Sequence, residues 1–472
     1  MSSISDPLAA PSEFVVISNR LPVKPSSRPG VRWETSPGGL VSALTPVLRD
    51  RPSTWIGWIG QADQKVRPFT HEGIRNDPVT LTAADVENYY EGFSNRTIWP
   101  LYHDAVRPAE FHRHWWRPYV AVNRRFAEVA ARRAARGGIV WIQDYQLQLV
   151  PGMLRELRPD VRIGFFLHIP FPPPELFRQL PWRTQILEGL FGADVIGFQS
   201  KPGAQNFARL ARQLAGASGR SGELVYDRRH ILVDAFPISI DFDHYSDLAA
   251  DPKIRERAAE FRERLGHRRR VLLGVDRLDY TKGIDIRLQA FRDLLEARRF
   301  GIDDVVFVQI GVPSRIRVSE YQELTHRIHQ MVGEINGKFG RVGLSPVEYF
   351  GRSFGPEELV ALYVAADVMI VTPLRDGMNL VAKEYIACRN NASGVLVLSE
   401  FTGSARELKQ SLVVNPHDID GLADNITAAL RMPSVEQRKR MRALRRQVRQ
   451  NDVHAWAERF LDALMEATPT DA

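Results

Sequence analysis

Short apolar runs alternate with longer stretches of helical periodicity along most of the chain, and this alternation limits the possible folds more than any other feature. The apolar runs are short enough to be buried strands and cover residues 14–18, 139–142, 163–167, 194–198, 271–275, 305–309, 368–371 and 395–398. The helical stretches include residues 40–48, 108–134, 319–339 and 435–449. Strands that alternate with helices predict an α/β fold with parallel sheets.

The chain length predicts more than one domain. At 472 residues the chain exceeds what a single hydrophobic core usually holds. A strand-like run over residues 231–236 gives way to a proline and an Asp-rich segment, which places the boundary within residues 238–251. We therefore predict a first doubly wound domain over residues 1–245 and a second over residues 246–451. A final amphipathic helix over residues 452–467 must pack against one of them.

The overall charge is basic, with 63 Lys and Arg against 56 Asp and Glu. This excess fits an ordinary soluble protein, or one that binds anionic ligands such as phosphates. A basic run over residues 438–449 makes nucleic acid a third candidate, but no aromatic platform is interleaved with its arginines. We interpret this run as the solvated face of a helix and expect no nucleic-acid partner.

The cysteine content and the N-terminus bear on the compartment. The single cysteine, Cys388, excludes an internal disulfide and fits a reducing environment. Residues 1–12 contain neither a basic segment nor an apolar run, and no later stretch reads as a membrane span. We therefore expect a cytoplasmic protein that has no membrane partner.

Polar side chains follow several of the predicted strands at the point where each strand ends. They are Arg20, Asp144, His168, Arg277 and Asp376. Open parallel sheets bind ligands beyond the carboxyl ends of their strands, so this regularity predicts ligand sites at sheet edges. Two such sheets that face each other would enclose a cleft between the domains.

Residues 372–384 contain groups suited to both a sugar and a phosphate. A turn with a proline and a glycine leads into a helix near Met378, and backbone N–H groups at a helix start are free to bind an anion. Asp376 and Glu384 can accept hydrogen bonds from sugar hydroxyls. Arg277 and Lys282, which follow an earlier strand, could bind an anionic group, although a surface ion pair is the alternative for either one alone.

Three ordered motifs carry a resemblance to a known family. They are Ser18-Asn19-Arg20-Leu21-Pro22-Val23, Arg277-Leu278-Asp279-Tyr280-Thr281-Lys282-Gly283 and Thr372-Pro373-Leu374-Arg375-Asp376-Gly377-Met378-Asn379-Leu380-Val381-Ala382-Lys383-Glu384. From about residue 14 to about residue 460 the chain resembles the trehalose-6-phosphate synthases, which are retaining GT-B glycosyltransferases of family 20. The resemblance implies two doubly wound Rossmann-like domains that face each other across a cleft, with the final helix, residues 452–472, packed back on the first.

The resemblance also implies an activity. A retaining hexosyltransferase of this family would transfer glucose from a nucleoside diphosphate glucose (UDP-, ADP- or GDP-glucose) to glucose 6-phosphate. The products would be α,α-trehalose 6-phosphate and the nucleoside diphosphate, and the leaving phosphate would act as the base. We expect no metal and no other cofactor.

Individual residues take their expected roles from the same resemblance. The matching catalytic residues are Arg277, Lys282, Asp144 and His168. The donor would be bound by Gly39, Arg277, Lys282, Asp376, Met378, Asn379, Leu380 and Glu384. The acceptor would be bound by Arg20, Tyr90, Trp99, Asp144 and Arg315. Taken singly, Tyr90 and Trp99 would more often be core aromatics, and His168 a satisfied histidine.

Two features of the sequence depart from this pattern or compete with it. Several relatives have histidines where this chain has Gln143 and Gln146, and glutamine cannot titrate, so any role there must be hydrogen bonding. Asp241-Phe242-Asp243 matches the Asp-x-Asp metal motif of the other large glycosyltransferase fold, but it lies in the interdomain segment and not after a central strand. The first departure concerns the acceptor pocket and leaves the reaction class unchanged.

The sequence alone does not exclude other functions. A related enzyme could use another phosphorylated acceptor, such as glycerol 3-phosphate, since Arg20 and Arg315 suit any phosphate. A catalytically silent sugar-nucleotide sensor would not need the complete set of donor residues. The sequence leaves open the nucleobase of the donor and the oligomeric state, with a homo-oligomer among the alternatives.

Overall fold

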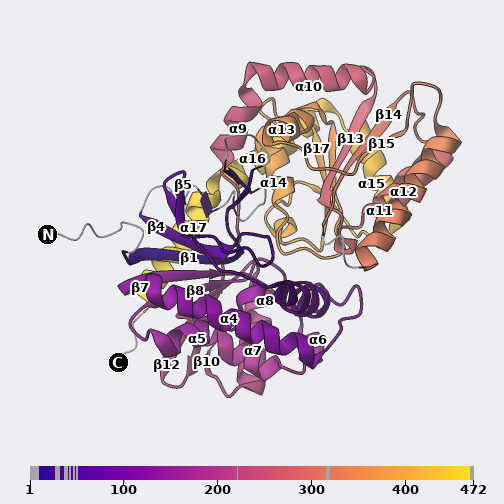
Figure 1. The fold of residues 1–472 in the computed structure, drawn as a ribbon. Helices are drawn as coiled ribbons and strands as arrows, with labels where there is room; N and C mark the ends of the chain where they lie inside the picture. Colours follow the sequence, from indigo (N-terminus) through magenta and orange to yellow (C-terminus); the bar gives the residue numbers. More distant parts are fainter. Residues whose placement is uncertain are drawn as a thin grey trace. The chain divides into compact units, whose positions relative to one another are not determined.

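The computed structural model describes residues 10–26, 32–36, 41, 44–45, 48, 52–220, 222–314 and 319–467. Contacts between residues divide the chain into two compact units. Unit 1 is Met1–Ile238 together with Val453–Ala472, and unit 2 is Ser239–Asp452. Each unit contains a sheet with helices packed around it (Figure 1).

The main sheet of unit 1 is parallel at its centre and antiparallel at its edges. Its order among the described residues is β10-β11-β12-β9-β8-β7-β1-β4-β6-β5. Its strands are β1 (Ser12–Arg20), β4 (Ser53–Trp58), β5 (Phe69–His71), β6 (Ile74–Pro78), β7 (Ala134–Gln143), β8 (Arg162–Phe166), β9 (Val195–Phe198), β10 (Ser218–Arg220), β11 (Glu223–Tyr226) and β12 (Arg229–Ala235). The strands from β12 to β6 in this order pair in parallel, and β10, β11 and β5 pair antiparallel. A separate pair joins β2 (Val23–Pro25) and β3 (Trp33–Thr35).

The chain adds strands to both sides of β1. It adds β4 and β6 on one side of β1 and later returns to add β7 on the other side. The sheet therefore has a topological switch point between β1 and β7, where open α/β sheets usually bind ligands. Strand β1 is apolar and buried over Phe14–Ile17 and ends at the exposed Arg20, as expected for a central strand that opens into a site.

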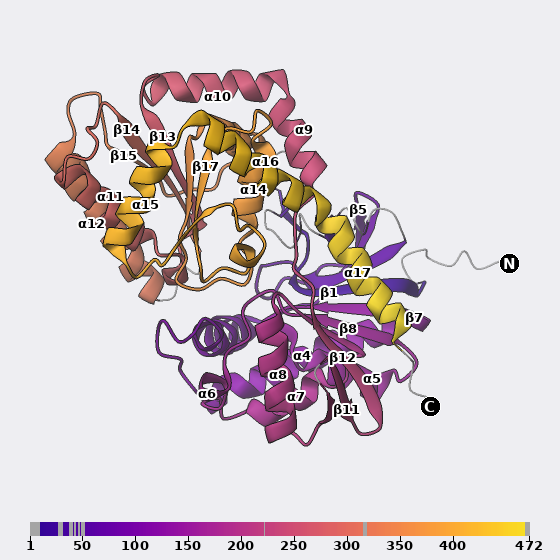
Figure 2. The ribbon, with the colours of Figure 1, turned by 180° about the vertical axis from the view of Figure 1, so that it is seen from behind.

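The helices of unit 1 cover its sheet. They are α2 (Ala83–Asp85), the π-helix η1 (Val86–Ile98), α3 (Trp99–Tyr102), α4 (Arg113–Arg133), the 3-10 helix η2 (Tyr145–Leu147), α5 (Val150–Leu157), α6 (Pro174–Phe177), α7 (Arg183–Leu190), α8 (Lys201–Leu214) and α17 (Val453–Glu466). Helix α17 reaches unit 1 from the far end of the sequence and lies against strands of the sheet (Figure 2). Its Trp456 donates from Nε1 to the Phe236 carbonyl at 3.1 Å, and its Phe460 stacks on Trp141 with ring centroids 4.7 Å apart.

The sheet of unit 2 is parallel throughout, in the order β15-β14-β13-β16-β17-β18. Its strands are β13 (Arg270–Arg277), β14 (Val305–Val312), β15 (Val347–Phe350), β16 (Val368–Val371), β17 (Val395–Ser399) and β18 (Leu412–Val414). The chain builds outward from β13 to β15 and then begins again at β16, so the switch point lies between β13 and β16. All four residues of β16 are buried, because helices cover both faces of the sheet.

The helices of unit 2 form two layers. They are α9 (Phe242–Ala250), α10 (Pro252–Arg264), the 3-10 helix η3 (Tyr280–Lys282), α11 (Ile284–Glu296), α12 (Ser319–Phe339), α13 (Pro356–Ala365), α14 (Leu380–Cys388), the 3-10 helix η4 (Gly403–Arg406), α15 (Ile419–Arg431) and α16 (Ser434–Gln450). Helices α11, α12 and α15 pack together on one face, and α9, α13, α14 and α16 pack together on the other (Figure 1).

Every predicted strand overlaps an observed one, but several observed elements are absent from the prediction, among them β4 and η1. Strand β4 is buried throughout, but Ser53, Thr54 and Gly57 interrupt it, so it is not the continuous apolar run from which the other strands were predicted. The turns of the π-helix η1 are closed by i→i+5 hydrogen bonds, so its side chains do not follow the 3.6-residue period that identifies an α-helix. The helix predicted over residues 319–339 coincides with α12, and part of the one predicted over residues 40–48 lies outside the described residues.

Candidate functional site

The switch point of unit 2 positions Arg277 and Lys282. Strand β13 ends at Arg277, which is exposed, and the chain then turns through η3 to Lys282, which is buried. Asp279 holds this turn, because its Oδ1 accepts from the Thr281 N–H at 3.0 Å. Gly283 follows with φ 61°, and a Cβ there would lie 2.5 Å from the Thr372 carbonyl oxygen, so only glycine fits.

Lys282 contacts the neighbouring loop after β16. Its Nζ lies 2.6 Å from Asp376 Oδ2, and the Asn379 side chain donates to the same oxygen at 3.1 Å. The two loops are also tied through their backbones, since the Leu374 N–H donates to the Thr281 carbonyl at 2.7 Å. A predicted phosphate-binding cation and a predicted sugar-binding carboxylate are thus brought together from opposite sides of the switch point.

The start of α14 is shaped by Asn379. This residue has φ 73° and ψ 88°, and its Oδ1 accepts from the Ala382 N–H at 3.2 Å as the N-cap of the helix. The Met378 carbonyl accepts from Ser404 N–H at 3.1 Å, so the loop is fixed before the helix begins. Leu380 is the first helical residue. The structure therefore groups Asp376, Met378, Asn379 and Leu380 in one ordered turn.

Glu384 lies one turn into α14 and is buried. Tyr363 donates to Glu384 Oε2 at 2.8 Å. Burial raises the pKa of the Glu384 carboxyl, and hydrogen bonds from Tyr363 and Tyr245 oppose that rise. The preceding residue, Lys383, pairs with Glu407 at 2.8 Å and not with Glu384.

Arg287 is a buried charged residue that the sequence analysis did not identify. It is fully buried on α11, and its Nη1 lies 2.7 Å from Asp276 Oδ2, the residue before Arg277. Its Nη2 donates to the Lys282 carbonyl at 2.7 Å, and its Nε donates to Thr372 Oγ1 at 3.1 Å. Burial raises the pKa of Asp276, and Arg287 opposes that rise. One guanidinium therefore joins the ends of β13 and β16 and the Lys282 turn.

A cavity of about 490 Å³ adjoins this edge of unit 2. Its described lining comes from the ends of β13, β14 and β15 and from α12: Leu278, Pro313, Ser314, Tyr321, Gln322, Thr325, His326, His329, Tyr349 and Gly351. The buried Tyr349 Oη has no hydrogen-bond partner among the residues that the structure describes. The cavity is predominantly neutral, so it suits a ring with polar edges better than a phosphate.

In unit 1, the Arg20 guanidinium contacts two aromatic side chains. Its guanidinium carbon lies 4.3 Å from the ring centroid of Trp58 and 5.7 Å from that of Tyr90. Tyr90 comes from η1 and meets Trp58 edge-on at 6.0 Å. Cation–π contacts of this kind hold the charge in place while its N–H groups stay available to an anion. Trp58, at the end of β4, is an addition to the predicted set.

Asp144 follows β7 in a strained conformation. Its φ of 74° and ψ of 171° belong to a region that non-glycine residues seldom adopt. Three hydrogen bonds fix it: its N–H donates to the Phe166 carbonyl at 2.8 Å, its Oδ1 accepts from His168 N–H at 3.1 Å, and its carbonyl accepts from Leu147 N–H at 3.2 Å. Asp144 and His168 are therefore neighbours, as their positions after adjacent strands predict.

The His168 imidazole is held by a neutral partner. Its Nε2 lies 2.9 Å from Gln143 Oε1, and its ring lies 4.7 Å from that of Phe166 and 6.3 Å from that of Trp456. Burial lowers the pKa of His168 to about 3, so the ring is neutral at physiological pH.

Trp99 is nearly fully buried, at 4% exposure, between His103 and Tyr145, whose rings lie 4.1 and 5.6 Å away. The structure thus gives it the packing of a core aromatic. Gly39 and Arg315 lie outside the described residues.

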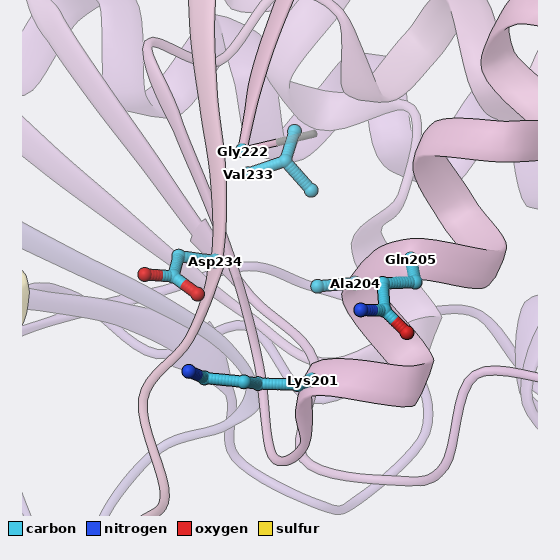
Figure 3. Close-up of a pocket in the computed structure, with 6 residues that line it drawn as sticks. All are labelled: Lys201, Ala204, Gln205, Gly222, Val233 and Asp234. Atoms are coloured by element: carbon cyan, nitrogen blue, oxygen red, sulfur yellow. The ribbon is translucent and has the colours of Figure 1, made fainter. Parts of the chain in front are cut away.

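A second cavity, which lies in unit 1, contains none of the predicted site residues. It has a volume of about 280 Å³ and is lined by Lys201, Ala204, Gln205, Gly222, Val233 and Asp234. Figure 3 shows that the lining residues of α8 face Val233 and Asp234 on β12. Lys201, Gln205 and Asp234 are solvent-exposed, so this cavity is a polar surface depression.

The Asp-x-Asp motif has a structural role. Asp241 caps α9 by accepting from the His244 N–H at 3.0 Å, and Asp243 pairs with Arg449 at 3.2 Å. In the described part of the chain, no group of three His, Cys, Asp or Glu side chains is placed to hold a metal ion. Within the same residues, no helix combines the length and apolar character that crossing a membrane requires.

Comparison with known proteins gives matches over nearly the whole chain. Residues 12–466 match the sequence model of glycosyltransferase family 20. A trehalose-6-phosphate synthase of Mycolicibacterium smegmatis is 56% identical over 468 residues, which cover 97% of this chain and 93% of the relative.

Solved structures match both units. An alpha,alpha-trehalose-phosphate synthase (UDP-forming) from Burkholderia vietnamiensis gives a TM-score of 0.90 at 34% identity, over 98% of this chain and 99% of that one. A Burkholderia xenovorans enzyme of the same description, in complex with glucose-6-phosphate, gives a TM-score of 0.88 at 33% identity, over 96% and 99% of the two chains.

Proposed function

Because the chain belongs to glycosyltransferase family 20, we propose that it transfers glucose with retention from a nucleoside diphosphate glucose to glucose 6-phosphate. The products are α,α-trehalose 6-phosphate and the nucleoside diphosphate. The family, the GT-B fold and the glycosyltransferase class expected from the sequence agree with the matches over 97% of the chain. The proposal includes the predicted cytoplasmic location.

One observation carries the proposal. Lys282 and Asp376 meet at 2.6 Å across the switch point of unit 2, beside Arg277 at the end of β13. This arrangement places two cations where a diphosphate would leave and a carboxylate where a sugar hydroxyl would bind. The Burkholderia xenovorans relative solved with glucose-6-phosphate supports that acceptor, and nothing in the comparisons favours glycerol 3-phosphate.

In the proposed reaction, no side chain of the protein forms a covalent bond with the sugar. The bond between the glucose C1 and the leaving phosphate oxygen breaks while the acceptor hydroxyl attacks from the same face. The departing phosphate takes the hydroxyl proton, and Arg277 and Lys282 stabilise the charge that develops on the diphosphate. Glu384 binds the ribose hydroxyls, and Asp376 orients the glucose. Arg20, held against Trp58 and Tyr90, binds the acceptor phosphate.

The test is an assay of nucleoside diphosphate release. UDP-, ADP- and GDP-glucose are crossed with glucose 6-phosphate, glycerol 3-phosphate and no acceptor, each with and without EDTA. UDP-glucose is the first donor to try, since the solved relatives at about one-third identity are described as UDP-forming. We expect release that needs glucose 6-phosphate and is unaffected by EDTA. Release only with glycerol 3-phosphate, or none with any donor, would overturn the proposal.

A further inference from the structure

Gln143, which is buried, and His168, which is partly buried, form an uncharged pair beside the strained Asp144. Gln143 ends β7 and is fully buried, and its Oε1 lies 2.9 Å from His168 Nε2. Asp144, the next residue, accepts from the His168 backbone N–H at 3.1 Å. Two consecutive residues therefore hold His168, one through its ring and the other through its backbone.

Apart from Asp144, the groups around the His168 ring are apolar or uncharged. Strand β8 contributes Phe166 and helix α17 contributes Trp456, while Gln199 donates to the His168 carbonyl at 3.4 Å. Asp144 is the ionisable group that faces His168 from β7, and its carboxylate is engaged by the backbone N–H. No neighbour described here stabilises a charged imidazolium, which agrees with the lowered pKa of the ring.

The hydrogen-bond geometry selects one tautomer. A neutral imidazole has one N–H donor and one acceptor nitrogen, and the partner of one nitrogen decides the state of both. With Gln143 Oε1 facing it, Nε2 carries the proton and Nδ1 is the acceptor. The other end of the amide, Gln143 Nε2, is buried without a partner in the described structure.

We propose that Gln143 is a positioning residue that holds His168 as the neutral Nε2–H tautomer, so that His168 acts on the substrate as a hydrogen-bond acceptor through Nδ1 and not as a proton donor. The inference rests on the proposed function, because that function places His168 near the reaction centre. A glutamine suits this role because it accepts a hydrogen bond at every pH, whereas a histidine or carboxylate in its place would titrate with the ring.

The direct test is the tautomer of His168 in the ligand-free enzyme. Nitrogen-15 NMR of histidine-labelled protein reports the protonation of each ring nitrogen, and a His168→Asn variant assigns the signal among the 12 histidines. We expect an Nε2–H signal that does not titrate between pH 5 and 8. An Nδ1–H tautomer, or a titration in that range, would overturn the inference.

Two substitutions and a control separate positioning from simple destabilisation. Gln143→Leu removes the acceptor and should mix the tautomers and lower kcat by about 10-fold or more, as loss of a histidine-orienting partner does elsewhere. Gln143→Glu should put a carboxylate beside Nε2, charge the ring near neutral pH and make the rate depend on the titration of His168. The control is Gln148→Leu, because Gln148 is also fully buried and accepts from Tyr102 at 2.7 Å.

The outcomes distinguish the inference from the proposed function. Gln148→Leu should lower the melting temperature and leave the His168 signal as it is. Gln143→Leu with an unchanged tautomer and unchanged kcat would refute the positioning role even if the synthase activity is present. Absence of synthase activity in the native enzyme would refute the function, whereas the tautomer measurement does not depend on turnover.

Discussion

Lys282 Nζ lies 2.6 Å from Asp376 Oδ2, although the two residues are 94 positions apart in the sequence. The pair joins the loop after β13 to the loop after β16, the two strands that flank the switch point of unit 2. A diphosphate bound here would give the lysine a second anionic partner. The contact holds the lysine at the switch point, where the proposed function places the diphosphate of the donor.

Removal of either predicted donor cation should slow the chemical step. Arg277→Ala and Lys282→Ala should each lower kcat about 100- to 1,000-fold, the usual effect of losing one preorganised group that stabilises developing charge. Steady-state kinetics with saturating donor measures this. The control is Arg270→Ala at the opposite end of β13, where Arg270 pairs with Asp367. Near-normal kcat in both variants would contradict the assignment.

Glu384→Gln should make stability less sensitive to pH. Burial raises the pKa of folded Glu384 above its unfolded value, so the folded state holds the proton more tightly. Stability from this group is therefore greatest below the unfolded pKa and falls as the pH rises through the folded pKa. Thermal melts from pH 4 to 8 should show the native enzyme losing stability relative to the variant as the pH rises. The variant should also have a higher KM for the donor than the native enzyme, because Glu384 is proposed to bind the ribose hydroxyls.

Gly283→Ala should be destabilising, because φ is 61° and the new Cβ would lie 2.5 Å from the Thr372 carbonyl. The left-handed conformation alone costs about 1–2 kcal/mol in a residue with a side chain. Gly333→Ala on the exposed part of α12 has open space around it and should stabilise by about 0.5–1 kcal/mol. Chemical denaturation of both variants gives the comparison, and equal effects would show that the turn is not constrained as described.

Arg287→Met should destabilise the enzyme by about 3–5 kcal/mol, because it leaves the buried Asp276 without its ion-pair partner. It should also weaken donor binding, since the Lys282 carbonyl and Thr372 lose their donor. Arg269→Met is the control, because Arg269 is also buried and binds the Val305 and Ser345 carbonyls, away from the switch point. Calorimetric titration of the donor into both variants should show weaker binding for Arg287→Met alone. Equal donor affinities would limit Arg287 to a role in folding.

Arg20→Ala should raise the KM for glucose 6-phosphate about 10- to 100-fold, which corresponds to one charge-assisted hydrogen bond to the phosphate. Arg20→Lys should raise the KM less than Arg20→Ala does, because lysine keeps the positive charge but lacks the guanidinium that stacks on Trp58. Arg96→Ala is the matched control, since Arg96 also lies over a tryptophan, Trp115, at 5.2 Å. Initial rates at varied acceptor concentration measure the effect. Equal KM values for the native enzyme and all three variants would contradict the assignment of Arg20 to the acceptor site.

The sequence by itself determined the architecture and the order of the site residues. Buried parallel strands are continuous apolar runs, and the polar residue that follows each run marks a sheet edge, so Arg20, Asp144, His168, Arg277 and Asp376 could be identified by position. The ordered motifs then predicted the family, which the comparisons confirm.

Only the tertiary structure decided which side chains meet. The contacts of Lys282 with Asp376, of Gln143 with His168 and of Arg287 with Asp276 join different strands and helices, and no local pattern encodes such pairing. Burial decided their chemistry as well. The pKa of His168 is lowered and that of Glu384 raised because the surrounding fold removes water from both groups, and a linear sequence does not specify solvent exposure.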